Sequence, residues 1–217
     1  MRVLHTSDLH GKYKRLLSVD EPFDVWLDTG DFFDNLGRKP RTDYRIVAEL
    51  ESQAQAKWWA WKDLGRRLAD WLDGRPAITV AGNHDFLRLG GVLRHDYAEV
   101  HEVATAGCEV LGLRWAGFRE VTRDIGEWAG ETDLPALEDL ARATLECVPD
   151  VVATHARPAH VLQRDRMNHA GLPGFQGSSA RWHFFGHEHA TGGTVEAIGG
   201  TTYVNGACHV RIPDLEI

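Results

Sequence analysis

Several short apolar segments of the chain each run directly into a cluster of polar residues. In the clearest case residues 77–81 are apolar or β-branched, and Gly82-Asn83-His84-Asp85 follows them. An apolar run that ends at a glycine turn predicts a buried strand with polar side chains at its carboxyl end. Ligands bind at that end of open α/β sheets, so the pattern favours a functional site. By itself it is equally compatible with a tight turn in which Asp85 starts the next helix.

The same pattern occurs near the N-terminus. Residues 2–6 predict a short strand, and Asp8 and His10 follow it. Side chains at positions i and i+2 point to the same side, so this carboxylate and this imidazole can chelate one ion. A pair with this spacing is also frequent by chance, so the rest of the chain must decide its role.

A further strand is predicted over 23–27, and several carboxylates come after it. Gly30 lets the backbone turn sharply and brings Asp31 to the strand end, where its two oxygens can bridge two cations. Asp34 follows three residues later, within reach of the same cleft. Either carboxylate can instead cap a helix or form an Asx turn, and for Asp28 we prefer that structural role.

Two later strands end in histidines. Residues 150–154 run into His155, and residues 181–185 run into Gly186-His187-Glu188-His189. Histidines at i and i+2 after a glycine turn can serve one ion each or share one. Glu188 points the other way and is expected to be structural.

The remaining segments complete an α/β pattern. Residues 42–72 predict one long helix or two, with a buried face formed by Trp58, Trp61, Leu64, Leu68 and Leu72. We interpret the tryptophans as core packing rather than as a platform for stacking nucleobases. A second sheet is predicted from strands over 97–103 and 108–113 and from a closing hairpin over 192–205. A further helix is predicted over 134–145.

Two segments have no clear period and are predicted to be loops that shape a substrate pocket. They are residues 116–133 and 158–177, both rich in glycine. Four arginines on or before the first loop are candidates to face an anionic substrate: Arg88, Arg94, Arg119 and Arg123.

Composition narrows the class of protein. A length of 217 residues fits a single domain spanning 1–217. The net charge of -8 leaves little attraction to nucleic acid or to an anionic membrane. The three cysteines, Cys108, Cys147 and Cys208, lack CxxC spacing and indicate neither a disulfide framework nor a thiolate metal site. Without an apolar leader or a membrane-spanning run, we expect a soluble, cytoplasmic protein.

Taken in chain order, the polar clusters read D-x-H, G-D-x-x-D, G-N-H-D, H and G-H-x-H. This set, from residue 2 to His189, resembles the calcineurin-like metallophosphoesterase superfamily, in particular its small bacterial-type phosphodiesterases. The resemblance implies an α/β fold, a four-layer α/β/β/α sandwich of two mixed sheets flanked by helices.

The resemblance also implies a ligand set for two divalent ions. One ion would be held by Asp8, His10, Asp31 and His189, and the other by Asp31, Asn83, His155 and His187. Mn²⁺ is the expected ion, and Fe, Zn²⁺ and Ni²⁺ also suit these donors. A hydroxide bridging the ions would attack phosphorus. His84 would bind the phosphate with Asn83 or protonate the leaving oxygen, with Asp34 orienting its ring.

Departures from branch patterns narrow the substrate. Protein serine/threonine phosphatases carry Arg and Glu where this chain has Asn35 and Asp85. Residues 4–10 and 30–34 look like the DNA-repair exonucleases, but those continue into a further DNA-binding region. The segment 192–208 is similar to small phosphodiesterases acting on cyclic nucleotides and aryl diesters. We therefore expect a small-molecule, nucleotide-like phosphoester as substrate, most of all a diester.

Three alternatives stay open at this stage. They are a nuclease acting on nucleic-acid ends, a phosphomonoesterase or protein phosphatase, and a non-catalytic metal-binding scaffold. The scaffold is disfavoured because every ligand position of the five motifs is filled in this chain.

Overall fold

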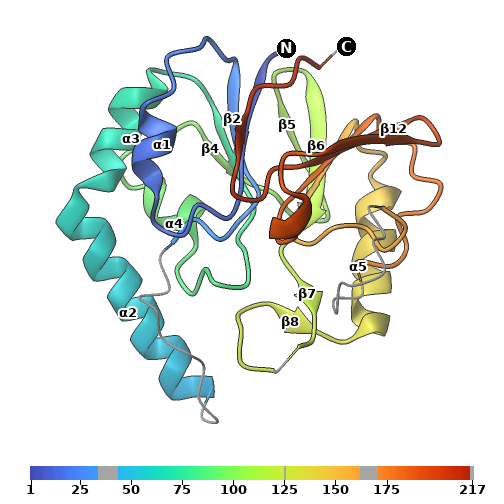
Figure 1. The fold of residues 1–217 in the computed structure, drawn as a ribbon, viewed down its shortest axis with the longest axis horizontal. Coiled ribbons are helices and arrows are strands. Elements are labelled where there is room, and N and C mark those ends of the chain that lie inside the picture. The colour runs from blue at the N-terminus through green and yellow to red at the C-terminus, as the bar shows by residue number, and fades with distance from the viewer. Residues whose placement is uncertain (34–43, 125, 162–170, 216–217) are drawn as a thin grey trace.

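The computed structural model describes residues 1–33, 44–124, 126–161 and 171–215, and Figure 1 shows two large sheets at its centre. The first sheet has the order β13-β1-β2-β3-β4. Its strands are β1 (Val3–Thr6), β2 (Val25–Asp28), β3 (Ala77–Thr79), β4 (Val100–Glu102) and β13 (Val210–Arg211). The first four pair in parallel and β13 is antiparallel to β1, so the sheet is mixed.

The second sheet has the order β11-β12-β10-β9-β6-β5. Its strands are β5 (Cys108–Val110), β6 (Leu113–Phe118), β9 (Val151–Thr154), β10 (Trp182–Phe185), β11 (Val195–Ile198) and β12 (Thr201–Asn205). The four central strands are parallel and both edge strands are antiparallel to their neighbours. The predicted C-terminal hairpin is confirmed as β11 and β12. A separate short pair consists of β7 (Val121–Thr122) and β8 (Glu131–Thr132).

Helices cover the outer faces of the two large sheets (Figure 1). On the first sheet lie α1 (Tyr13–Leu17), α3 (Leu64–Leu72) and α4 (Leu89–Leu93), and α2 (Tyr44–Lys62) extends from α3. On the second lies α5 (Leu134–Glu146), which matches the predicted helix, and a short 3-10 turn, η1, spans His189–Thr191. Among the described residues, no helix is long and apolar enough to cross a membrane.

The four layers follow from the alternation of side chains along the strands. In β1, Val3 joins a buried cluster that contains residues of both sheets, whereas Leu4 joins a cluster with the helical Leu16 and Leu68. Successive side chains of a strand point to opposite faces, so an entirely apolar strand must be covered on both sides. The expected four-layer sandwich is confirmed.

The strand predicted over 97–103 lies in the first sheet, as β4, and not in the second. One further strand prediction and one loop prediction were wrong in their bounds. Residues 108–113 are not one strand, because Leu111 and Gly112 both have positive φ and form the two-residue turn between β5 and β6. A two-residue turn with positive φ at both positions matches the right-handed twist of paired strands, so this segment forms a hairpin and not a straight strand. The segment 116–133 is not a loop throughout: β6 continues to Phe118, and β7 and β8 lie within it. The described parts of 158–177 contain a single β-bridge, Pro158 to Leu172.

The predicted face of the long helical segment was wrong at Trp61, whose surface is 76% exposed. Asp63 adopts a left-handed conformation and separates α2 from α3, so one helical period does not continue across both. Over residues 48–62, where the side chains of α2 are described, the buried positions are Glu51, Gln55 and Trp59, spaced four residues apart. Because two of these are polar, hydrophobic periodicity alone did not identify this face.

Candidate metal centre

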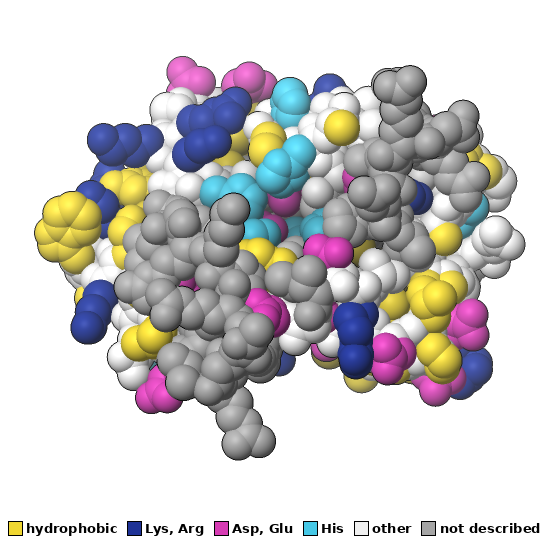
Figure 2. All heavy atoms as spheres, turned by 60° about the horizontal axis from the view of Figure 1, so that its bottom comes forward, with side chains coloured by type: hydrophobic (Ala, Val, Ile, Leu, Met, Phe, Trp, Pro, Cys, Tyr) yellow, Lys and Arg dark blue, Asp and Glu magenta, His cyan; other side chains and the backbone are white. Residues whose placement is uncertain are grey.

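The polar clusters predicted from the sequence meet at one edge of the molecule. They follow β1, β2 and β3 of the first sheet and β9 and β10 of the second. Backbone bonds join the turns: Asp8 N donates to Gly30 O at 2.8 Å, His10 N to Asp31 O at 2.9 Å and Gly186 N to His155 O at 2.8 Å. Figure 2 shows histidine and acidic side chains gathered in a hollow on this face.

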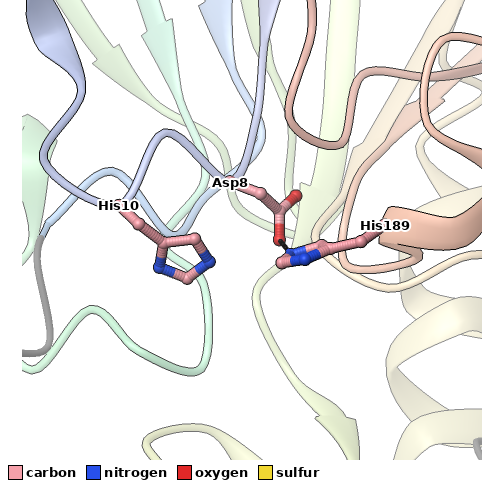
Figure 3. A group of neighbouring side chains, drawn as sticks. All are labelled: Asp8, His10 and His189. Atoms are coloured by element: carbon pink, nitrogen blue, oxygen red, sulfur yellow. Dashed lines mark hydrogen bonds and ion pairs between the residues drawn. The ribbon is translucent and has the colours of Figure 1, made fainter. Parts of the chain in front are cut away.

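The first group of metal-compatible donors is Asp8, His10 and His189. One ligand atom from each lies within 4.8 Å of the others. His189 Nε2 is 2.9 Å from Asp8 Oδ1, and Figure 3 shows His10 on the other side of that carboxylate. The second oxygen of Asp8 accepts bonds from Ser7 Oγ at 2.6 Å and His187 N at 2.8 Å, which orient the carboxylate.

The second group is Asp31, His155 and His187, again with ligand atoms within 4.8 Å of one another. His155 Nδ1 is 2.7 Å from Thr29 O, and because a carbonyl only accepts, Nδ1 is the donor. His155 Nε2 then faces two oxygens, Asn83 Oδ1 at 2.9 Å and Asp31 Oδ2 at 3.4 Å. Three atoms with lone pairs converge, and only a proton or a cation between them makes this favourable.

The pKa values of the donor groups are shifted in the directions expected where ionised carboxylates face positive charge. Although burial opposes the imidazolium form, the Asp31 carboxylate raises the pKa of His155 to about 10. Burial likewise opposes ionisation of Asp31, but the charge and hydrogen bond of His155 hold its pKa below the ordinary value. For Asp8, burial is outweighed by the bond from His189, which lowers its pKa. Two ionised carboxylates in a buried setting match a cation-binding site.

Backbone strain is concentrated in these turns. Asp8, His10, Asp31 and His187 all have positive φ, at 55°, 41°, 55° and 66°. Such conformations are uncommon for residues with a Cβ and persist where the surrounding structure imposes them. Here they turn donor side chains from separate loops toward common points.

Two glycines are required by close approach in the same turns. A Cβ on Gly82 would lie 2.1 Å from Asp31 Oδ1, and one on Gly186 would lie 1.8 Å from Ser7 Oγ. Neither distance is compatible with a side chain. The glycines of the G-N-H-D and G-H-x-H motifs therefore let the chain pass directly against the carboxylates.

His84 lies beside both donor groups without belonging to either. Its backbone N donates to Asp31 Oδ1 at 2.8 Å, and its Nε2 is 3.9 Å from Asp31 Oδ2. Its ring centroid is 5.1 Å from that of His10. The side chain is 20% exposed, so His84 can reach a bound molecule. Asp34, predicted to orient this ring, lies outside the described residues.

Several neighbouring carboxylates are structural. Asp85 accepts backbone bonds from Gly82 N, Asp31 N and Phe33 N and so ties two turns together. It does not begin a helix, since α4 starts at Leu89. Asp28 accepts from Thr6 Oγ1 and Gly30 N, the expected turn-forming role.

Glu188 also has the structural place expected for it. Its side chain is 2% exposed and lies 3.4 Å from the guanidinium of Arg157. It is absent from both donor groups.

Three residues support His84 and its turn although local sequence patterns did not single out their roles. Arg119 Nη2 donates to Gly82 O at 3.0 Å and Asp85 O at 3.1 Å. Gln55 donates to His84 O at 2.7 Å. The Trp128 ring lies 4.2 Å from the His84 ring between centroids.

The other candidate arginines have local partners rather than places at the donor groups. Arg88 pairs with Glu102 and Arg123 with Asp133, and Arg94 donates to Val100 O.

Comparisons with known proteins came from three sources. A family model described as calcineurin-like phosphoesterase matches residues 1–191. No curated protein sequence matches the chain. Among solved structures, TT1561 of Thermus thermophilus shares 16% identity at a TM-score of 0.58, over 94% of this chain and 88% of that one. Phosphopantetheinyl Hydrolase (PptH) from Mycobacterium tuberculosis shares 15% at 0.55, over 95% and 89%. At these identities the two structures establish a common fold.

Proposed function

The chain belongs to the calcineurin-like phosphoesterase family of metal-dependent phosphoric ester hydrolases, and from that premise we propose that it hydrolyses small, nucleotide-like phosphodiesters. The observation that carries the proposal is the convergence of the two donor groups, with His84 between them and solvent. The proposal has three parts: the metal ligands, the role of His84 and the preference for a diester.

Two ions are proposed. One would be bound by Asp8, His10, Asp31 and His189, and the other by Asp31, Asn83, His155 and His187, with Asp31 shared. The facing lone pairs of His155, Asn83 and Asp31 and the donor atoms gathered within 4.8 Å support this set. Bound there, two divalent ions would supply a water of lowered pKa as the nucleophile and would offset the negative charge of the phosphoryl oxygens. Nitrogen and oxygen donors together suit Mn²⁺, our first choice, and also Fe, Zn²⁺ or Ni²⁺.

His84 is proposed as the group that binds the phosphate and protonates the leaving oxygen. In the reaction, oxygen from water bonds to phosphorus, the bond from phosphorus to the leaving oxygen breaks, and His84 donates its proton to that oxygen. Without a bound phosphate, burial lowers the pKa of His84, and the charge of Asp31 opposes this shift. A bound phosphate adds negative charge and favours the protonated ring. Asp34 is proposed to orient the ring.

A diester is favoured over a monoester. A monoester carries an additional negative charge, which an arginine would have to balance. Two arginines near the site already bind groups of the protein itself. Arg119 donates to backbone carbonyls and Arg157 is within 3.4 Å of Glu188. The segment 192–208, which resembles small phosphodiesterases, and the absence of the protein-phosphatase residues at Asn35 and Asp85 add support. The negative net charge disfavours nucleic acid as the main substrate.

We also propose a reducing, cytoplasmic location. The three cysteines are free, and burial raises the pKa of each thiol, so all three remain protonated at neutral pH. This proposal is independent of the catalytic one.

Substrate preference is tested with the protein loaded with Mn²⁺. Activity is compared on bis(p-nitrophenyl) phosphate, p-nitrophenyl phosphate, 2′,3′- and 3′,5′-cyclic nucleotides and single-stranded DNA. We expect at least one small diester to have the highest kcat/KM. Higher kcat/KM for the monoester than for every diester would exclude the proposed preference, and DNA as best substrate would favour the nuclease.

The role of His84 is tested separately with His84→Ala and with His95→Ala, an exposed histidine, as the matched control. Loss of His84 should lower kcat and leave metal content unchanged, whereas the control should retain both. If His84→Ala released metal instead, His84 would be a ligand and its proposed role would be wrong.

A further inference from the structure

Trp128 is held against His84 by a short loop between β7 and β8. Glu131 accepts backbone bonds from both sides of this loop, Asp124 N at 2.7 Å and Trp128 N at 3.1 Å. Ala129 N, the next residue, donates to Asn83 O at 3.0 Å. The backbone at Trp128 is therefore held by hydrogen bonds at residues 124, 128 and 129, the last of them to the turn that carries His84.

The position of Trp128 is not explained by core packing. It is half-buried, and it belongs to none of the hydrophobic clusters formed by the described residues. Within that part of the chain, its aromatic contact is His84, at 4.2 Å between centroids and 41° between planes. A large aromatic side chain that is anchored but not packed into the core is typical of a binding surface.

We infer that Trp128 determines specificity by stacking on an aromatic ring carried by the leaving group of the phosphodiester, either the base of a nucleoside or an aryl ring. The inference rests on the proposed function, because it takes His84 as the group that faces the leaving oxygen. Whatever is attached to that oxygen must then lie close to His84, and the indole beside His84 is the surface it meets. In a cyclic nucleotide the attached group is the nucleoside, and its base offers a flat π-face.

Trp128 and a base can interact without sequence-specific hydrogen bonds. Stacking on a tryptophan tolerates any base, since every base presents the same kind of face. The inference therefore names a class of substrate, one whose leaving group carries an aromatic ring, and not a particular base.

The test compares two cyclic diesters, of which only one carries an aromatic group. One is 2′,3′-cyclic AMP and the other is glycerol 1,2-cyclic phosphate, which has no aromatic group. In Trp128→Leu we expect kcat/KM for cyclic AMP to fall about 10- to 100-fold more than that for the glycerol diester. A loss shared by both diesters would measure the contact of Trp128 with His84. Trp128→Phe should retain most of the activity, and Trp61→Leu, at an exposed tryptophan of α2, should match the wild type.

Equilibrium binding supplies a readout that does not depend on turnover. Calorimetry on the Mn²⁺-loaded proteins compares 2′-AMP with inorganic phosphate. Trp128→Leu should weaken binding of 2′-AMP by a similar factor and leave phosphate binding unchanged.

Two outcomes separate failure of the inference from failure of the proposed function. If both diesters lose activity equally and 2′-AMP binding is unchanged, Trp128 only positions His84, and the inference is wrong while the function stands. If the wild type hydrolyses neither diester, the proposed function is wrong, and the binding comparison still decides whether Trp128 recognises an aromatic group.

Discussion

His155 and Asn83 belong to loops of different sheets, yet His155 Nε2 lies 2.9 Å from Asn83 Oδ1. His155 follows β9 and Asn83 follows β3. The other ring nitrogen of His155, Nδ1, donates its proton to Thr29 O. The two sheets therefore meet at a point where His155 Nε2 faces Asn83 Oδ1. With Nε2 unprotonated, both side chains would present lone pairs, as expected of two ligands of one ion.

Loss of His155 should remove one of the two ions. We expect His155→Ala to bind about one ion per chain instead of two and to lose at least about 100-fold in kcat/KM, because a ligand is lost outright. Metal content after dialysis, measured by elemental mass spectrometry, checks this. His95→Ala should keep two ions, and a variant of His155 that also kept two would contradict its assignment as a ligand.

Arg119 should stabilise the turn that carries Asn83 and His84. In Arg119→Met the carbonyls of Gly82 and Asp85 lose their bonds from the guanidinium, at an expected cost of about 1–3 kcal/mol in the free energy of unfolding. A small displacement of the turn should also lower kcat about 10-fold. Urea denaturation and steady-state kinetics measure the two effects.

The control for Arg119 is Arg123→Met. Arg123 forms an exposed ion pair with Asp133, and exposed pairs contribute little to stability. Equal effects of the two substitutions would show that the bonds of Arg119 to the turn have no special importance.

Gly82 should not tolerate even a methyl group. The Cβ of Gly82→Ala would lie 2.1 Å from Asp31 Oδ1, so the carboxylate or the turn must move. We expect loss of metal binding and a lower melting temperature, measured by calorimetry and thermal unfolding. Gly91→Ala is the matched control: it lies in α4, its nearest neighbour is 3.8 Å away, and a helical alanine should stabilise by about 0.5–1 kcal/mol. Full metal binding by Gly82→Ala would contradict the required contact.

His183 should make stability depend on pH. It is fully buried, and burial lowers the pKa of the ring from 6.5 to about 3. Between these values the unfolded chain binds a proton at His183 and the folded chain does not, so folding becomes less favourable as pH falls. The contribution reaches about 1.4 kcal/mol per pH unit. His183→Phe removes it and places another ring among Phe175, Phe185 and Tyr203.

The comparison of wild type and His183→Phe uses urea denaturation from pH 7 to pH 4. EDTA is added to both samples, so that both proteins are measured without bound metal at every pH. The stability difference should shift in favour of the variant as pH falls below about 6.5. If the free energies of unfolding of the two proteins changed in parallel with pH over this range, His183 would not have the lowered pKa.

Much of the fold and of the site could be predicted from local pattern. The strands that precede Asp8, Asp31, Asn83 and His155 are short and largely apolar or β-branched, and each ends shortly before its polar residue. Strands buried on both faces read as continuous apolar runs, so their ends are visible in the sequence. The order of the five motifs then allowed the donor groups to be named before their geometry was known.

Other features could not be predicted, because they depend on contacts between distant segments. Trp61 was predicted to lie in the core, although α2 buries Glu51, Gln55 and Trp59. The buried Gln55 is satisfied by the hydrogen bond that it donates to His84 O. Hydrophobic periodicity cannot identify a buried face that contains hydrogen-bonded polar residues.

The sequence by itself determined which residue types stand at the ends of the buried strands, because alternation of apolar side chains and glycine turns is a local property of the chain. The tertiary structure decided what those residues do together. Only the packing of the two sheets against each other brings His155 against Asn83 and Asp31. Only the loop between β7 and β8 places Trp128 against His84. Proximity between residues so far apart in the sequence arises from packing, and no local spacing encodes it.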